Sequence, residues 1–153
     1  MFLIDDELKE FLESGVAVVI GTADERGRPG VVFAWGPRIS EDRSHVTLFL
    51  EKARAATPLA NLAATGQIAM TVASPVSVRS VQLKGRWQGQ SDATGNDLGW
   101  VQRHRDAFLI EASLVGDPPA GISNLWMDDL LRIDFSVERA FDQTPGPSAG
   151  QAL

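Results

Sequence analysis

The sequence predicts a mainly β (α+β) fold, an antiparallel barrel or closed sheet with helices packed outside it. Segments with strand composition outnumber helical segments, and short loops rich in turn residues join most of them. Strands and helices do not alternate regularly, as they would in a doubly wound sheet. The length of 153 residues corresponds to one domain. A domain of this size can bury about two-thirds of its unfolded surface, so it can form a core without disulfides.

Six segments of the chain are expected to be strands. Most of them are rich in β-branched or aromatic residues, or alternate between apolar and polar side chains. The expected strands are Val16–Thr22, Gly30–Trp35, His45–Leu50, Ile68–Ala73, Val76–Gln90 and Leu131–Glu138. The turn residues Asp24–Gly27 join the first two strands into a hairpin, and Gly36-Pro37 is expected to end the second.

Three helices are expected between these strands. Asp5–Ser14 has acidic residues in its first turn and apolar residues at helical spacing. A second helix begins with Thr57 as its N-cap and Pro58 at its first helical position. The third helix covers Asn96–Val115, with Asn96 as the N-cap.

The longest expected strand has one polar and one apolar face. The apolar side chains are those of Val81, Leu83 and Trp87. The polar side chains are those of Ser80, Gln82, Lys84 and Arg86. A strand of this pattern turns its apolar face to the core. The polar face then either binds an anion or a polar ring, or is the hydrated outer face of an antiparallel sheet.

Charge and composition exclude several functions. Fourteen Lys and Arg against twenty Asp and Glu give a net charge of -6, which argues against nucleic acid and anionic membrane surfaces as partners. The chain has no cysteine, hence no disulfide, thiolate nucleophile or cysteine metal site, and we expect it in the cytoplasm. No stretch approaches the roughly 20 apolar residues of a membrane span.

Few residues suggest side-chain catalysis or metal binding. The two histidines, His45 and His104, are far apart in the sequence, so no metal site is expected, and His104 is expected on the exposed face of a helix. The chain has no tyrosine, no G-x-S-x-G elbow and no phosphate-binding glycine loop. Trp126, in a loop, is the tryptophan that we expect to stack on a flat ligand or on a partner chain.

The best local signal for ligand binding precedes the second helix. Two cations, Lys52 and Arg54, are followed by Thr57 and Pro58 at a helix start. Free N–H groups, a hydroxyl and the positive end of the helix dipole would converge there, which suits a phosphate monoester. The alternative interpretation is a solvated loop followed by an ordinary N-cap.

The order of elements resembles the pyridoxamine 5'-phosphate oxidase-like family of FMN-binding split barrels. The matching pieces are the opening helix with LKEFLES, the hairpin GVAVVIGTADERGRPGVVFAW, the segment HVTLFLEKARAATPLANLAATGQIAMTV and the strand VRSVQLKGRW. This resemblance implies an antiparallel split β-barrel with flanking helices, an FMN-binding domain over residues 1–141 and a Pro- and Gly-rich tail over residues 142–153. It also implies a homodimer with FMN in clefts at the interface.

The resemblance also implies which residues bind the cofactor. Arg54 and Thr57 lie where the family contacts phosphate, although many members have a Ser/Arg/Lys cluster there and this chain has ARAATP, with Lys52 upstream. Gln82 and Lys84 lie on a strand that also approaches the cofactor. The flavin ring would be lined, partly through backbone groups, by Val32, Phe33, Ala34, Trp35, Phe49, Leu50 and Glu51.

Three functions remain open at this point. The first is an FMN-dependent oxidoreductase acting on a small molecule, in which the flavin carries the redox chemistry and no catalytic side chain is required. The second is a non-enzymatic protein that stores or senses a flavin, the deazaflavin F420 or haem. The third is a structural module that has lost its ligand.

Overall fold

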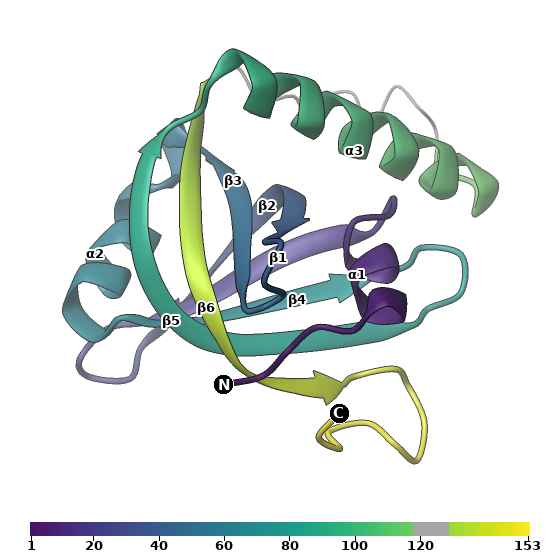
Figure 1. Cartoon of the computed structure of the whole chain (residues 1–153), viewed down its shortest axis with the longest axis horizontal. Coiled ribbons are helices and arrows are strands. Elements are labelled where there is room, and N and C mark those ends of the chain that lie inside the picture. Colours follow the sequence, from purple (N-terminus) through teal and green to yellow (C-terminus); the bar gives the residue numbers. More distant parts are fainter. Residues whose placement is uncertain (118–128) are drawn as a thin grey trace.

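The computed structural model describes residues 1–117 and 129–153, and its strands form one closed antiparallel barrel in the order β1-β2-β3-β6-β5-β4 (Figure 1). The six strands within these residues are β1 Ala17–Ala23, β2 Pro29–Ile39, β3 His45–Glu51, β4 Gln67–Ala73, β5 Ser80–Asp92 and β6 Leu130–Asp142. The predicted mainly β split barrel with flanking helices is therefore confirmed.

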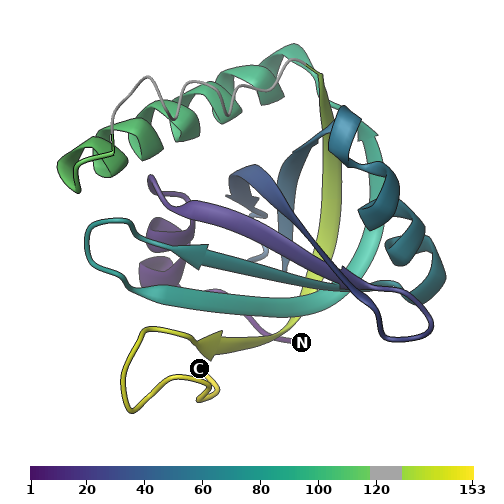
Figure 2. The ribbon, with the colours of Figure 1, turned by 180° about the vertical axis from the view of Figure 1, so that it is seen from behind.

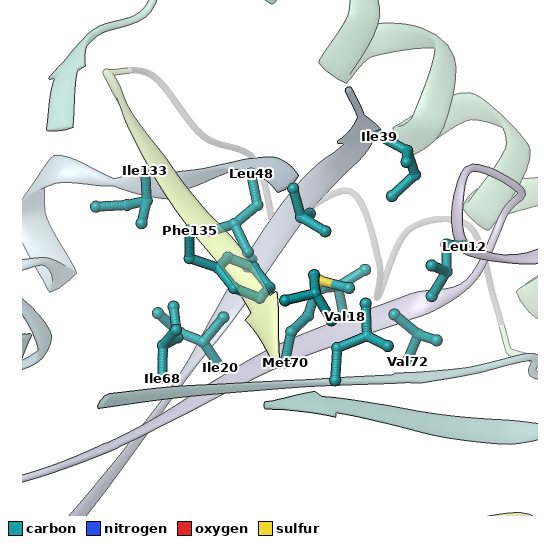
Figure 3. Packing of buried hydrophobic residues seen from close by; sticks show 14 of the residues in the cluster. Leu12, Val18, Ile20, Ile39, Leu48, Ile68, Met70, Val72, Ile133 and Phe135 are labelled. Carbon is teal, nitrogen blue, oxygen red and sulfur yellow. The ribbon is translucent and has the colours of Figure 1, made fainter. Parts of the chain in front are cut away.

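Alternating side chains build the core inside the barrel. In β1, Val18 and Ile20 are buried while their neighbours in the strand are partly exposed. Figure 3 shows these two residues in one cluster with Met70, Leu48 and Phe135 from other strands. Burying an aliphatic or aromatic side chain of this size contributes roughly 1.5–3 kcal/mol, so this cluster is the main source of stability.

Strands β5 and β6 are the longest, and Figure 1 shows both curving around the barrel. Their pairing shifts register between Lys84 and Gly85 and again between Trp87 and Gly89. A Cβ atom at Gly85 would lie 1.8 Å from the backbone oxygen of Ser136, so the two strands approach too closely there for any side chain. These bulges allow the two strands to bend.

Three α-helices flank the barrel within the described residues. They are α1 Asp6–Leu12, α2 Ala56–Thr65 and α3 Gly95–Leu114, and a short 3₁₀ helix, η1 Lys52–Arg54, precedes α2. Helix α2 packs against β1 and β2, and α3 packs against β2. In Figures 1 and 2, α3 lies across one side of the barrel, while the C-terminal tail lies on the opposite side.

Two predicted strand boundaries are wrong. Strand β2 continues through Gly36 and Pro37 to Ile39, because a bulge with Gly36 at φ +57° redirects the strand instead of ending it. Strand β5 begins at Ser80 and not at Val76, because the chain turns between Ser74 and Arg79, where the Ser74 N–H donates to the Arg79 carbonyl.

Two predicted helix caps are also wrong. Helix α2 begins at Ala56 because η1 leads directly into it, so Thr57 lies inside the first turn. Helix α3 is capped by Thr94 and not by Asn96. The Thr94 hydroxyl accepts from the Asp97 N–H, and the Asp97 carboxylate accepts from the Thr94 N–H, which forms a capping box.

The tail does not form a core but folds back onto the end of β6. Ala152 pairs with Phe141, and the Leu153 N–H donates to the Ala140 carbonyl. The Asp142 carboxylate accepts from the Ser148 hydroxyl at 2.6 Å, which closes the turn between the two segments. Backbone pairing thus orders a segment that has too few apolar side chains to bury.

Among the residues that the structure describes, no helix is long and apolar enough to cross a membrane.

Candidate functional site

A groove of about 470 Å³ lies where β2 meets the start of α2. Four of the residues predicted to bind a cofactor line it, namely Val32, Phe33, Arg54 and Thr57. Pro58, from the helix start that the sequence singled out, also lines it, together with Val19, Gly30 and Val31, which the sequence analysis missed. The volume falls within the roughly 300–1,000 Å³ typical of ligand and cofactor sites.

One wall of the groove is apolar and exposed. Val31 is 73% exposed and Phe33 is 51% exposed, on the outer face of β2. Val19 pairs with Phe33 in the β1–β2 ladder, so the two side chains adjoin on that face. Apolar side chains exposed beside a groove mark a surface that a flat ligand or a second chain can cover.

The groove is also lined by polar groups. Arg54 ends η1, its side chain is 68% exposed, and its Nε donates to Glu51 Oε2 at 3.0 Å. No described side chain caps α2, and its first turn contains Thr57. The first N–H groups of a helix have no partner within the helix, and the helix dipole is positive at this end. A guanidinium, a hydroxyl and a helix N-terminus therefore line the same groove as the apolar side chains.

The second predicted cation, Lys52, does not line the groove. Its Nζ lies 2.8 Å from an Asp92 carboxylate oxygen and 3.3 Å from one of Asp129. Hydrogen bonds to Asp92 and then Asp129 raise the pKa of Lys52 above its usual value, so it remains charged. Lys52 thus ties η1 to the end of β5 and the start of β6.

A second hollow, of about 460 Å³, adjoins the groove and also has Thr57 in its lining. Its other lining residues include Asn61, which is 7% exposed and whose amide donates to Thr22 Oγ1 at 3.0 Å. This buried hydrogen bond fixes α2 on β1, and it thereby fixes the position of the helix N-terminus at the groove.

Comparison with known proteins identifies the family. A family profile described as pyridoxamine 5'-phosphate oxidase matches residues 4–119. The chain belongs to this family. The comparison with curated proteins found no match.

Solved structures of the pyridoxamine 5'-phosphate oxidase family and its fold include proteins named for different ligands. An F420 reductase is 18% identical, with a TM-score of 0.59, covering 86% of this chain and 94% of its own. HupZ of Group A Streptococcus is 16% identical, with a TM-score of 0.56, covering 97% and 100%. An FMN-binding protein from Syntrophomonas wolfei subsp. wolfei is 13% identical, with a TM-score of 0.51, covering 90% and 87%. These identities show the shared fold alone.

Four further residues that the resemblance to the pyridoxamine 5'-phosphate oxidase family implies are buried in this structure. Ala34 and Leu50 belong to the barrel core. Trp35 and Phe49 lie in a separate cluster under α3 with Val101. The side chains of these four residues pack against other protein side chains, so only their backbone groups remain for a ligand.

Three further residues that the resemblance implies, Glu51, Gln82 and Lys84, do not line the groove. Gln82 is on β5, where its amide donates to Thr71 Oγ1 at 3.0 Å. Lys84 borders a different hollow on the outside of the barrel. Glu51 acts as the carboxylate partner of Arg54. Trp126 lies outside the described residues.

His104 is not on the exposed face of the helix, where the sequence placed it. Its ring is 5% exposed, and its Nδ1 accepts from the Gly36 N–H at 3.0 Å. Nε2 therefore carries the proton and donates to the Val16 carbonyl at 2.9 Å. The Gly36 carbonyl accepts from Trp100 Nε1 at 2.9 Å, so α3 holds the β2 bulge through both of its backbone groups. Burial lowers the pKa of His104 from 6.5 to about 4, and the hydrogen bond to the Val16 carbonyl raises this pKa only in part.

The described residues contain no group of three or more His, Cys, Asp or Glu side chains that could hold a metal ion.

Proposed function

We propose that this protein is an FMN-binding flavoprotein and an oxidoreductase acting on a small molecule. The observation that supports this most is the composition of the groove, which combines the apolar side chains of Val31 and Phe33 with Arg54 and the start of α2. FMN has the same division, since a flat ring system is joined by a ribityl chain to a phosphate monoester.

The residues present fit such a ligand. Arg54 and the first N–H groups of α2 would hold the phosphate, because a guanidinium forms charge-assisted hydrogen bonds with phosphate oxygens. Glu51 would position the Arg54 guanidinium through their 3.0 Å contact. Val19, Val31 and Phe33 would cover one face of the ring and exclude water from it. A bound flavin supplies the hydride and electron chemistry itself, so the protein contributes binding and orientation.

The groove supports a flavin better than haem. A haem iron needs an axial ligand such as His, Cys, Met or Tyr. None of the described residues that line the groove is of these types. His104 uses both ring nitrogens in hydrogen bonds under α3.

We also propose that the protein is a homodimer with the cofactor at the interface, in the cytoplasm. The support for the dimer is the exposure of Val31 and Phe33, which leaves an apolar wall that one chain does not cover. A second copy related by two-fold symmetry would bury the same surface on both chains. Size-exclusion chromatography with light scattering at micromolar concentration tests this. A monomer both with and without FMN would contradict it.

Titration with FMN and with riboflavin tests the groove directly. Riboflavin lacks the phosphate, so wild type should bind FMN at least about tenfold more tightly, the equivalent of one charge-assisted hydrogen bond. Arg54→Gln should bind FMN about as weakly as riboflavin and leave riboflavin binding unchanged. Arg26→Gln is the matched control, because Arg26 is an exposed residue in the β1–β2 loop. Equal FMN affinity of wild type and Arg54→Gln would refute the phosphate site.

A second measurement separates an enzyme from a storage or sensing protein. If the FMN-loaded protein is an oxidoreductase, a reduced nicotinamide cofactor or another donor should bleach the flavin absorbance, and an acceptor should restore it over many turnovers. If the protein binds F420 more tightly than FMN in the same titration, F420 is the cofactor, and the assignment of the groove as the binding site still holds.

A further inference from the structure

A different hollow, of about 330 Å³, lies on the outer face of the barrel on the other side of β1. Val19 of β1 lines the cofactor groove, whereas Gly21, two residues later on the same face, lines this hollow. Small residues, among them Ala69 and Gly85, leave the hollow open. We call this hollow, with the three cations Lys84, Arg86 and Arg139 that border it, the basic hollow.

Two of its cations face each other directly. Lys84 of β5 is the register partner of Arg139 of β6. Like charges in directly opposite positions of an antiparallel pair are destabilising. Within residues 1–117 and 129–153, neither side chain has a carboxylate partner within 4 Å, whereas Arg86 has Glu138 at 3.5 Å. In the described part of the chain, the fold therefore keeps two adjacent positive charges that no carboxylate contacts within 4 Å.

An aromatic ring holds both cations beside the basic hollow. The Lys84 Nζ lies 5.1 Å from the centroid of the Phe141 ring, and the Arg139 guanidinium carbon lies 5.8 Å from it. Cation–π contacts orient a charged group, but they leave its positive charge in place. Both cations are thus fixed at the rim and remain available to an anion.

This arrangement is unusual for this chain. Its net charge is -6, and most of its cationic side chains have a carboxylate partner, as Lys9, Arg38 and Arg132 do. Solubility alone does not require two cations without carboxylate partners to lie opposite each other in neighbouring strands at the edge of a hollow.

We propose that the basic hollow is a binding site for a small anionic molecule, with its phosphate or carboxylate group between Lys84 and Arg139. The Arg139 guanidinium can form two parallel hydrogen bonds with either group, and the Lys84 ammonium adds a point charge. The anion removes the repulsion between the two cations, and the small residues of the hollow leave room for the rest of the molecule. Glu138 at the rim disfavours a second anionic group on the side of Arg86.

Thermal unfolding with inorganic phosphate and with malonate as probes tests the site, using potassium chloride at equal ionic strength as reference. Because the cofactor groove is itself proposed to hold a phosphate, the comparison uses Arg54→Gln as the parent protein. Its Tm should rise saturably with at least one probe, and the tighter probe identifies the preferred anionic group. Adding Lys84→Gln and Arg139→Gln should weaken that apparent affinity at least tenfold, whereas adding Arg26→Gln should leave it unchanged.

Two further readouts distinguish ligand binding from a structural role. Without phosphate or malonate, the variant with Lys84→Gln and Arg139→Gln should be at least as stable as its parent, because the like-charge contact is gone. Its oligomeric state should also be unchanged. An unsaturable or absent Tm shift, a shift that survives both substitutions, a large loss of stability or a changed oligomeric state would each overturn the proposal. Loss of FMN binding in Arg54→Gln bears on the groove alone.

Discussion

Acidification should weaken the attachment of α3 to the barrel through His104. The neutral ring accepts from the Gly36 N–H at Nδ1 and donates to the Val16 carbonyl at Nε2. A proton on Nδ1 would replace the acceptor of the Gly36 N–H with a second donor, so this hydrogen bond would be lost. It would also place a positive charge on a residue that is only 5% exposed. This explains why the pKa of His104 lies near 4 and not at 6.5.

The size of the effect follows from that difference in pKa. The unfolded chain takes up a proton on this histidine below about pH 6.5, whereas the folded chain resists it until about pH 4. One pKa unit corresponds to about 1.4 kcal/mol, so the free energy of unfolding should fall by about 3 kcal/mol between pH 6.5 and pH 4. Below that window the contribution of His104 is constant.

Carboxylates affect a different pH range. A backbone N–H of Arg28 lowers the pKa of Asp24, and the Ser40 hydroxyl lowers that of Asp42, both from 3.8. Stabilisation from a carboxylate of this kind is present above its unfolded pKa and is lost as the pH falls through its folded pKa. The window from pH 4.5 to pH 6.5 therefore reports mainly on His104.

Urea unfolding followed by tryptophan fluorescence between pH 4.5 and pH 7.5 measures the effect. Trp35 is a suitable reporter, since its ring centroid lies 5.9 Å from that of His104. His104→Gln should be less stable than wild type at pH 7.5 and approach it towards pH 4.5. His45→Gln, at the partly exposed start of β3, is the control for loss of a histidine elsewhere in the fold. Parallel pH curves for wild type and His104→Gln would refute this account.

Three further predictions concern the backbone and are checked by the urea midpoint and the Trp fluorescence spectrum. Gly36→Ala should destabilise by about 2–3 kcal/mol, because φ is +57° and the new Cβ would lie 3.1 Å from Trp100 and from Val101. Gly27→Ala, at φ +74° with nothing within 4 Å, is its control and should cost only about 1 kcal/mol. Gly85→Ala should cost about 4 kcal/mol or more, since the Cβ clashes with a backbone oxygen, and a soluble variant of normal midpoint would contradict the register. Thr94→Ala should cost about 1 kcal/mol through loss of the α3 cap, whereas Asn96→Ala should cost little.

Strands were predictable from the sequence because each has a local pattern. The alternation of Leu131–Glu138 with its polar neighbours matches the burial of β6, and the polar and apolar faces of β5 are as expected between Ser80 and Lys84. Element ends were less predictable. Thr94, Asn96 and Asp97 are all capping residue types, and the end of β5 decides which of them caps α3.

His104 was misplaced because α3 has a weak pattern. Its buried residues include Asp97 and His104 as well as Val101 and Ala112, so hydrophobic spacing does not mark the inner face. Likewise Gly36 resembles a strand terminator, and its place in a bulge is visible only from the pairing of β2 with β3 and from the hydrogen bonds that α3 makes to it. Both errors involve contacts between residues far apart in the chain.

The candidate site was predictable where its chemistry is local. Arg54 and Thr57 were found because a cation, a hydroxyl and a helix start follow one another in the sequence. Lys52 was grouped with them, but it pairs with Asp92 and Asp129 instead. Val31 was missed although the sequence contains a signal for it. The run Val31–Trp35 is apolar on both strand faces, which is typical of a strand covered on both sides.

Strand β1 connects the groove with the basic hollow. Along a strand, residues two apart lie roughly 7 Å from each other, so Val19 and Gly21 place the two sites as neighbours across β1. Their linings differ sharply. The groove combines an apolar wall with a helix N-terminus, whereas the basic hollow combines small residues with two adjacent cations. On the two proposals, a flavin ring and an anionic molecule would lie on adjacent parts of one sheet face.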